Sequence, residues 1–249
     1  MREMGIKWMV AAAVQLCAGA ALAQGAPDGF TIGGLGILSS SPYAGEDMSA
    51  VVVPLLAYKQ GNFSIGTDGA RLKVFDRDAL SFSVLVAPRF PPLDGEESGP
   101  LAGMERGITA DAGVLAEYAL AEWTKFTLRA VTEVTAEHGG QEVTLGGQTR
   151  VAIAGIPMLL GGGAKWQSSG LSEYVYGVPA TDAALVRPAY APGAVVVPYI
   201  SLGTMYPINE RTRIFGSIKT EFLPGGVTDS PIIDSGLVTS LAVGVSFGF

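Results

Sequence analysis

LVTSLAVGVSFGF, residues 237–249, is the stretch that decides the fold of this chain. Large apolar side chains alternate along it with Ser, Ala and Gly, so a strand formed here has one apolar face and one small, polar face. The stretch ends on Phe249, and Phe247 stands two residues earlier on the same face. An alternating strand that ends on an aromatic residue is typical of the closing strand of a bacterial outer-membrane β-barrel. We therefore expect Val245, Phe247 and Phe249 to form a C-terminal assembly signal for the barrel-assembly machinery.

The other end of the chain predicts export. Arg2 and Lys7 form a short basic region, and residues 8–22 form an apolar run rich in Ala. This run is shorter than the roughly 20 residues that a membrane-spanning helix needs. Ala21 to Ala23 supplies the small residues that a signal peptidase requires, so we place cleavage after Ala23. The expected domains are a signal peptide, 1–23, and a single outer-membrane barrel, 24–249.

Composition narrows the class of protein further. Without the signal peptide, 14 basic and 22 acidic residues remain, a net charge of about −8 that argues against a nucleic-acid partner. No later segment approaches the roughly 18 uninterrupted apolar residues of a transmembrane helix. The only cysteine, Cys17, lies in the signal peptide, so we expect no disulfide in the exported chain.

The pattern of strands and loops predicts the number of strands. If Asp68 and Gly69 turn the chain into a hairpin, all long loops fall at one end, as bacterial barrels require. We therefore expect an all-β fold, a transmembrane antiparallel up-and-down β-barrel of about 12 strands, with ten as the alternative. The expected strands are 30–38, 50–58, 62–67, 69–75, 80–88, 111–120, 124–134, 142–153, 158–166, 194–206, 212–222 and 237–249.

Charged side chains share the small, polar face of these strands, which we assign to the lumen. An unpaired buried charge is costly, so a network of salt bridges that stiffens and partly occludes the barrel is the favoured interpretation. A mildly anion-preferring channel is the alternative. The expected lumen charges are Arg71, Lys73, Glu117, Lys125, Arg129, Glu133, Glu142, Arg150, Arg213, Lys219 and Glu221.

Aromatic residues near the strand ends suggest interfacial girdles, in which amphipathic rings lie at the level of the lipid headgroups. The candidates are Tyr58, Tyr118, Trp123, Trp166, Tyr199 and Tyr206.

The sequence predicts no catalytic, cofactor-binding or metal-binding residues. The only histidine, His138, stands beside Glu137 in an external loop, and such a pair could act as a general base. Nothing in the sequence fixes a nucleophile near it, and no second His or Cys exists in the exported chain to build a metal site. We therefore expect His138 to be a solvated loop residue, and a hydrolase at the barrel rim to be a distant alternative.

Several segments resemble the MipA/OmpV family of outer-membrane proteins. They are GGLGILSSSPYAGED (33–47), VVVPLLAY (51–58), EYVYGVPA (173–180), PAYAPG (188–193) and LPGGVTDSPII (223–233). The resemblance implies an outer-membrane scaffold, because the archetype of the family binds a lytic transglycosylase and a bifunctional penicillin-binding protein. It offers no catalytic residues. The positions that match it and look suited to shaping loops are Tyr43, Gly45, Tyr174, Gly177, Tyr190, Ser230 and Pro231.

Two functions follow as expectations. The first is a non-enzymatic scaffold for peptidoglycan-remodelling enzymes, which would contact partners at the periplasmic turns 121–123, 154–157 and 207–211. The second is a small-solute or osmoresponsive channel with a charged lumen. In both cases outer-membrane lipid and lipopolysaccharide are the expected surroundings, and no cofactor is expected.

Overall fold

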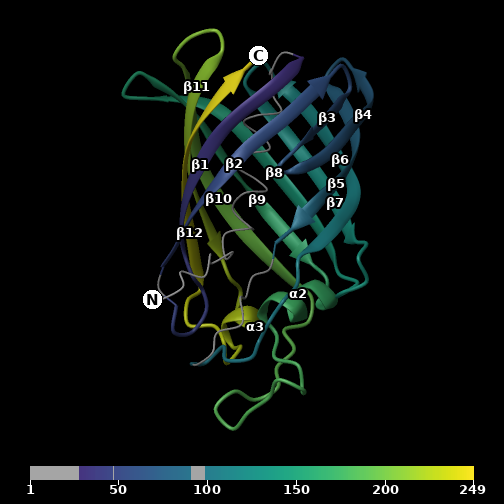
Figure 1. Cartoon of the computed structure of the whole chain (residues 1–249), viewed down its shortest axis with the longest axis vertical. Coiled ribbons are helices and arrows are strands. Elements are labelled where there is room, and N and C mark those ends of the chain that lie inside the picture. Colours follow the sequence, from purple (N-terminus) through teal and green to yellow (C-terminus); the bar gives the residue numbers. More distant parts are fainter. Residues whose placement is uncertain (1–27, 47, 91–98) are drawn as a thin grey trace, which may run out of the picture.

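The chain forms a closed antiparallel barrel of twelve strands (Figure 1). The structure, a computed structural model, describes residues 28–46, 48–90 and 99–249, so the expected signal peptide lies outside the described residues. The expectation of twelve strands is confirmed, and the alternative of ten is wrong. The strands are β1 (Gly29–Ser40), β2 (Met48–Gln60), β3 (Phe63–Gly66), β4 (Gly69–Arg77), β5 (Leu80–Arg89), β6 (Thr109–Ala121), β7 (Thr124–Glu133), β8 (Gln141–Ile153), β9 (Ile156–Gln167), β10 (Val195–Pro207), β11 (Thr212–Phe222) and β12 (Leu237–Gly248).

Each strand pairs with the next along the chain, and β12 returns to pair with β1. The closing register runs from Thr31 opposite Gly248 to Ser39 opposite Ser240. Along β12 the small residues face the interior and the large apolar residues face outward, as the alternation predicts. Closure gives every strand two neighbours, which satisfies most backbone groups as crossing a membrane requires, although the part of β2 before Ala57 pairs with β1 alone.

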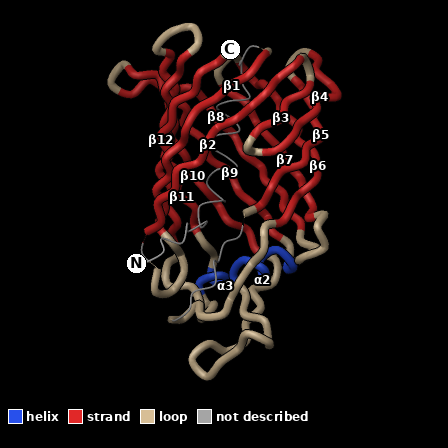
Figure 2. Tube along the Cα trace, viewed as in Figure 1, coloured by secondary structure: helices blue, strands red, loops and turns tan. Residues whose placement is uncertain are grey.

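The two ends of the barrel differ. Short turns join the strands at the end where the C-terminus lies, whereas the opposite end carries the long loops and two short helices, α2 (Ser169–Tyr176) and α3 (Gly225–Thr228) (Figure 2). Bacterial barrels have short periplasmic turns and long external loops, so the end with the helices is the external one. No helix among the described residues is long and apolar enough to cross a membrane. The sequence pattern predicted loops here and missed both helices.

The barrel wall is shortest at the β3–β4 hairpin. β3 has four residues and pairs only with the last four of β2, Ala57 to Gln60. Gly69 starts β4 with φ +117°, and an added Cβ would lie 2.2 Å from the Val86 carbonyl oxygen, so only glycine fits this turn. The hairpin predicted at Asp68 and Gly69 is confirmed.

Thr67 ties the tip of this hairpin to the edge of β2. The Leu56 amide donates to Thr67 Oγ1 at 2.9 Å, and this hydroxyl donates to the Pro54 carbonyl at 3.0 Å. The Pro54 carbonyl therefore points toward the hairpin. The backbone nitrogen of a strand residue points to the same side as its carbonyl, so the N–H that Pro54 lacks would also have pointed toward this edge of β2. A strand edge is where proline is tolerated, because no ladder hydrogen bond is lost there.

Removing the Thr67 hydroxyl should destabilise the barrel. In Thr67→Ala the Leu56 amide loses its acceptor beside the membrane, which we expect to lower the free energy of unfolding by about 1–3 kcal/mol. Thr67→Ser keeps the hydroxyl and should remain close to the wild type. Equilibrium urea unfolding of the refolded protein in lipid, followed by tryptophan fluorescence, measures the difference. Equal stability of the Ala and Ser variants would contradict this role for the hydroxyl.

Candidate functional site

The external loops pack together into a buried apolar core, which we call the loop cap. Side chains from the loops that follow β1, β5, β9 and β11 meet the inward-facing Val195 and Val197 at the start of β10. Met104, Val227 and Ile232 are fully buried in it. The cap therefore covers the external mouth of the barrel. Its members are Tyr43, Leu101, Met104, Tyr176, Val178, Val195, Val197, Leu223, Val227, Ile232 and Ile233.

Hydrogen bonds from side chains join the loops of the cap to one another. The Tyr43 hydroxyl donates to the Val175 carbonyl at 2.9 Å, and the Ser230 hydroxyl donates to the Tyr176 carbonyl at 2.6 Å. Tyr174 and Tyr190 similarly donate to backbone carbonyls of other loops. Burial raises the pKa of the Tyr176 hydroxyl to about 12. Four of the seven residues expected to shape loops thus do so by linking one loop to another.

Beneath the cap, an acidic side chain on β8 joins two arginines across the barrel interior. Glu142 lies 3.4 Å from Nη1 of Arg89 on β5 and 3.1 Å from Nη1 of Arg129 on β7. Arg89 also pairs with Asp111 on β6 at 2.6 Å. All four side chains are largely buried, so each charge depends on its partners for the stabilisation that water would otherwise give.

A second group of ion pairs joins side chains on β9 and β11. Lys165 on β9 lies 2.7 Å from Glu221 on β11, and Lys219 also pairs with Glu221. The Lys219 ammonium lies 4.7 Å from the ring centroid of Tyr199, which faces the lumen. The expectation that Tyr199 belongs to an interfacial girdle is therefore wrong. We call Arg89, Asp111, Arg129, Glu142, Lys165, Lys219 and Glu221 the lumen network.

An apolar cluster also lies inside the barrel, on the strands around its closure. Leu35 and Ile37 of β1, Leu55 of β2 and Phe215 of β11 pack together inside the barrel with Ala242. Gly244 leaves the space that the Phe215 ring occupies, because an added Cβ would lie 2.4 Å from that ring. Packed side chains thus occupy the lumen next to the charged groups.

The remaining expected lumen charges lie outside the lumen network. Glu133 is buried on the same face of β7 as Val131, and its carboxylate accepts the amides of Glu137, His138 and Gly139 in the external loop, so it lies at the external end of the inner face. Arg150 shares its face of β8 with Glu142 and Thr144, but it is exposed at the periplasmic end, 3.8 Å from the ring centroid of Trp123.

Of the other expected lumen charges, some form ion pairs and some are half-buried. Lys125 pairs with Glu117 at 2.8 Å. Lys73 pairs with Asp76 at 2.7 Å, where both side chains are more than one-third exposed. Arg71 and Arg213 are half-buried.

Three members of the lumen network are not among the lumen charges expected from the sequence. Arg89 was assigned to the start of a loop, and Lys165 was hidden in a run of small and apolar residues. Parity could have found both, since Arg89 shares a face with Leu85 and Ala87, and Lys165 shares one with Gly161 and Gly163. Asp111 was placed in a strand but was not recognised as a lumen charge.

His138 is half-buried, which corrects the expectation of a solvated loop residue. Its ring stacks on Tyr174 with the centroids 4.5 Å apart, and its Nδ1 accepts the Gly140 amide at 2.9 Å. Burial lowers the pKa of the imidazole, which keeps it neutral near pH 7 with its proton on Nε2. Within residues 28–46, 48–90 and 99–249, no three His, Cys, Asp or Glu side chains are grouped so as to hold a metal ion.

Removing the central carboxylate of the lumen network should destabilise the barrel strongly. Glu142→Ala leaves Arg89 and Arg129 close together without their shared counter-charge, so we expect a loss of about 3–5 kcal/mol in the free energy of unfolding. Glu117→Ala is the matched control, because its pair with Lys125 is more exposed and should contribute less than about 1 kcal/mol. Urea unfolding in lipid gives both values, and equal losses would contradict the central role of Glu142.

Comparison with known proteins places this architecture in a family. The chain matches the family model "MltA-interacting protein MipA" over residues 32–249. A putative outer membrane protein, YiaT of Escherichia coli (strain K12), is 28% identical over 223 residues, which cover 88% of this chain and 90% of that protein. The MltA-interacting protein of the same strain is 25% identical over 240 residues, covering 93% of this chain and 94% of that protein.

Among solved structures, the NanC porin covers 88% of this chain and 100% of its own, with a TM-score of 0.48 and 10% identity. The family match covers nearly the whole described barrel, and the relatives are named as outer-membrane proteins. The chain therefore belongs to the MltA-interacting protein MipA family and is a β-barrel of the outer membrane.

Proposed function

We propose that this protein is a non-enzymatic scaffold that holds a peptidoglycan-remodelling enzyme at the periplasmic face of the outer membrane. The observation that carries the proposal is the packing of the loop cap and the ion pairs of the lumen network within the outer half of the barrel, which would obstruct passage. A barrel obstructed in this way offers its rim and wall to partners. The name of the MltA-interacting protein of Escherichia coli, related along nearly its full length, supports the proposal. A lytic transglycosylase is thus the first partner, and a penicillin-binding protein the second.

Three neighbouring periplasmic turns offer the surface for such a partner. The turns between β6 and β7, β8 and β9, and β10 and β11 follow one another around the rim. Each carries an exposed apolar side chain, namely Trp123, Ile156 and Ile208. Exposed aromatic and aliphatic side chains next to polar groups are the usual anchors of protein interfaces. The turns are short, so the partner has to contact several of them at once.

Replacing these three turns should abolish capture of the enzyme. We expect a variant with Gly-Asn at residues 122–123, 155–156 and 208–209 to bind the purified lytic transglycosylase at least about tenfold more weakly, because the three apolar anchors are lost. Biolayer interferometry on the refolded protein measures this. The matched control carries the same change at Asp78-Ala79, a periplasmic turn in another part of the rim. Unchanged binding by the three-turn variant would refute this surface.

Contacts with the membrane are part of the same proposal. Val245 is exposed on the outer face of β12, and the rings of Phe247 and Phe249 meet edge to face with centroids 4.9 Å apart. This arrangement supports the assignment of Val245, Phe247 and Phe249 as the signal for the barrel-assembly machinery. The apolar outer face would contact membrane lipid, and the external loops would contact lipopolysaccharide.

The alternative function is a small-solute or osmoresponsive channel. The observation that favours it is that the cap consists of loops, which can move without breaking the paired strands of the wall. Opening the cap would leave the charges of the lumen network, together with the neighbouring apolar cluster, to control passage.

Conductance in a planar lipid bilayer separates the two functions. We expect the wild type to be silent because its cap is packed, and Met104→Ser with Ile232→Ser to produce openings because the buried core is weakened. Regular conductance steps in the wild type that change in Arg129→Gln, with the rim variant Arg150→Gln as control, would favour the channel instead.

A further inference from the structure

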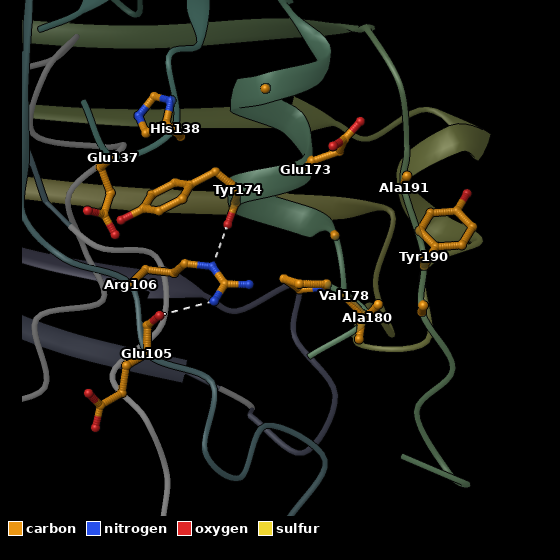
Figure 3. A pocket seen from close by; sticks show the side chains of 14 residues that line it. Glu105, Arg106, Glu137, His138, Glu173, Tyr174, Val178, Ala180, Tyr190 and Ala191 are labelled. Carbon is orange, nitrogen blue, oxygen red and sulfur yellow. Dashed lines mark hydrogen bonds between the residues drawn. The ribbon is translucent and has the colours of Figure 1, made fainter. Parts of the chain in front are cut away.

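A pocket of about 560 Å³ opens on the external side, beside the loop cap (Figure 3). We call it the outer pocket. Its walls come from the loop before β6, the loop between β7 and β8, helix α2 and the segment that follows α2. Its volume lies within the range of small-ligand sites, roughly 300–1,000 Å³. It is at the opposite end of the barrel from the periplasmic turns, so it is independent of the proposed scaffold function.

Two buried hydrogen-bond donors in this pocket have no acceptor. Arg106 is only 8% exposed at its side chain, and its Nε donates to the Tyr174 carbonyl at 2.9 Å while Nη1 donates to the Glu105 carbonyl at 3.0 Å. Its Nη2, however, has no partner, and neither has Nε2 of His138. Figure 3 shows the guanidinium of Arg106 directed into the pocket. Buried donors without acceptors are costly, so a ligand that brings two acceptors would be stabilised here.

The charges around the pocket select against an anionic ligand. The carboxylates of Glu105, Glu137 and Glu173 are exposed along its wall, whereas Arg106 is the one cation among its described lining residues and already lies 3.5 Å from Asp182. A phosphate or carboxylate would meet this excess of negative charge. Hydroxyl groups are suited to both kinds of partner, because one can accept from Arg106 and another from His138 on the other side of the Tyr174 ring, while both can donate to the glutamates.

Rings and small side chains complete the lining. Tyr174 is held from both sides, by the stacked His138 ring and by the Arg106 guanidinium 5.6 Å from its centroid, so it forms a rigid wall. Tyr190 lies across the pocket (Figure 3). Because both faces of Tyr174 are covered, Tyr190 is the ring that can pack against the apolar C–H face of a sugar, while the polar groups bind the sugar hydroxyls. We propose that the outer pocket binds a neutral saccharide of one or two rings.

The lone histidine of the chain gives a direct test on the wild type. The untagged mature protein has one imidazole, so one Cε1–H signal in an NMR spectrum reports on the pocket. The protein is refolded in a zwitterionic detergent without a sugar headgroup and titrated with glucose, galactose and N-acetylglucosamine. We expect at least one of them to shift the signal in a saturable manner. Glucuronate is the anionic comparison and should bind more weakly than the best neutral sugar, because it meets the three glutamates. Glucosamine is the cationic comparison and shows whether the pocket requires a cation.

Two sets of variants assign the binding to the proposed groups. Arg106→Lys and His138→Phe each remove one free donor while keeping the charge or the stacked ring, and each should weaken sugar binding about tenfold. Saturation-transfer NMR on the sugar measures this. Glu137→Gln with Glu173→Gln should allow glucuronate to bind while neutral sugars still bind. Glu210→Gln, in a periplasmic turn, is the control and should change nothing.

The proposal fails if no neutral sugar shifts the His138 signal, or if only glucuronate or only glucosamine does. It also fails if sugar binding is the same in the wild type and in both donor variants once gel mobility without heating shows that they are folded.

Discussion

Closure of β12 onto β1 is the constraint on which the rest of this structure depends. Once the sheet is closed, each strand has a lipid face and an inner face, and the period-two pattern assigns every side chain to one of them. Glu142 and Arg129 lie on neighbouring strands, and the curvature of the closed sheet brings Arg89 of β5 within reach of Glu142. The apolar outer face determines how neighbouring strands are aligned, and this alignment brings the charged side chains together. The ion pairs in turn stabilise the alignment of the strands.

The loop cap and the lumen network depend on each other. Val195 and Val197 belong to the wall but are part of the cap, and Lys165 lies directly opposite Val197 on the neighbouring strand. The cap keeps water away from the charges, which makes their mutual pairing necessary, while the paired charges form a base on which the apolar loops pack. Movement of the cap would therefore alter both the packing of the loops and the hydration of the charges.

The sequence was sufficient for the barrel and insufficient for its outer end. Alternation in segments such as 124–134 is a local signal, and it gave the strands, their number and the face of Arg129 correctly. The Glu133 carboxylate binds the amides of a loop, and the Tyr199 ring lies near the Lys219 ammonium; alternation along a strand does not specify either contact. Helix α2 is eight residues long and begins after Ser168, which makes no side-chain capping bond. Such a helix is held by packing in the cap rather than by its own sequence.

The short β3–β4 hairpin makes the barrel uneven in height around its circumference. A bilayer has nearly uniform thickness, so one side of this protein is too short for the hydrocarbon layer that its other sides span. The membrane can respond by thinning beside the hairpin, or the barrel can respond by tilting, each at a modest cost for every ångström of mismatch. Four residues of strand in place of ten or more thus give the protein a preferred orientation relative to the membrane normal. Lipids beside β2 and the hairpin would be packed differently from those around the rest of the wall. This difference would be located in the outer leaflet next to the hairpin.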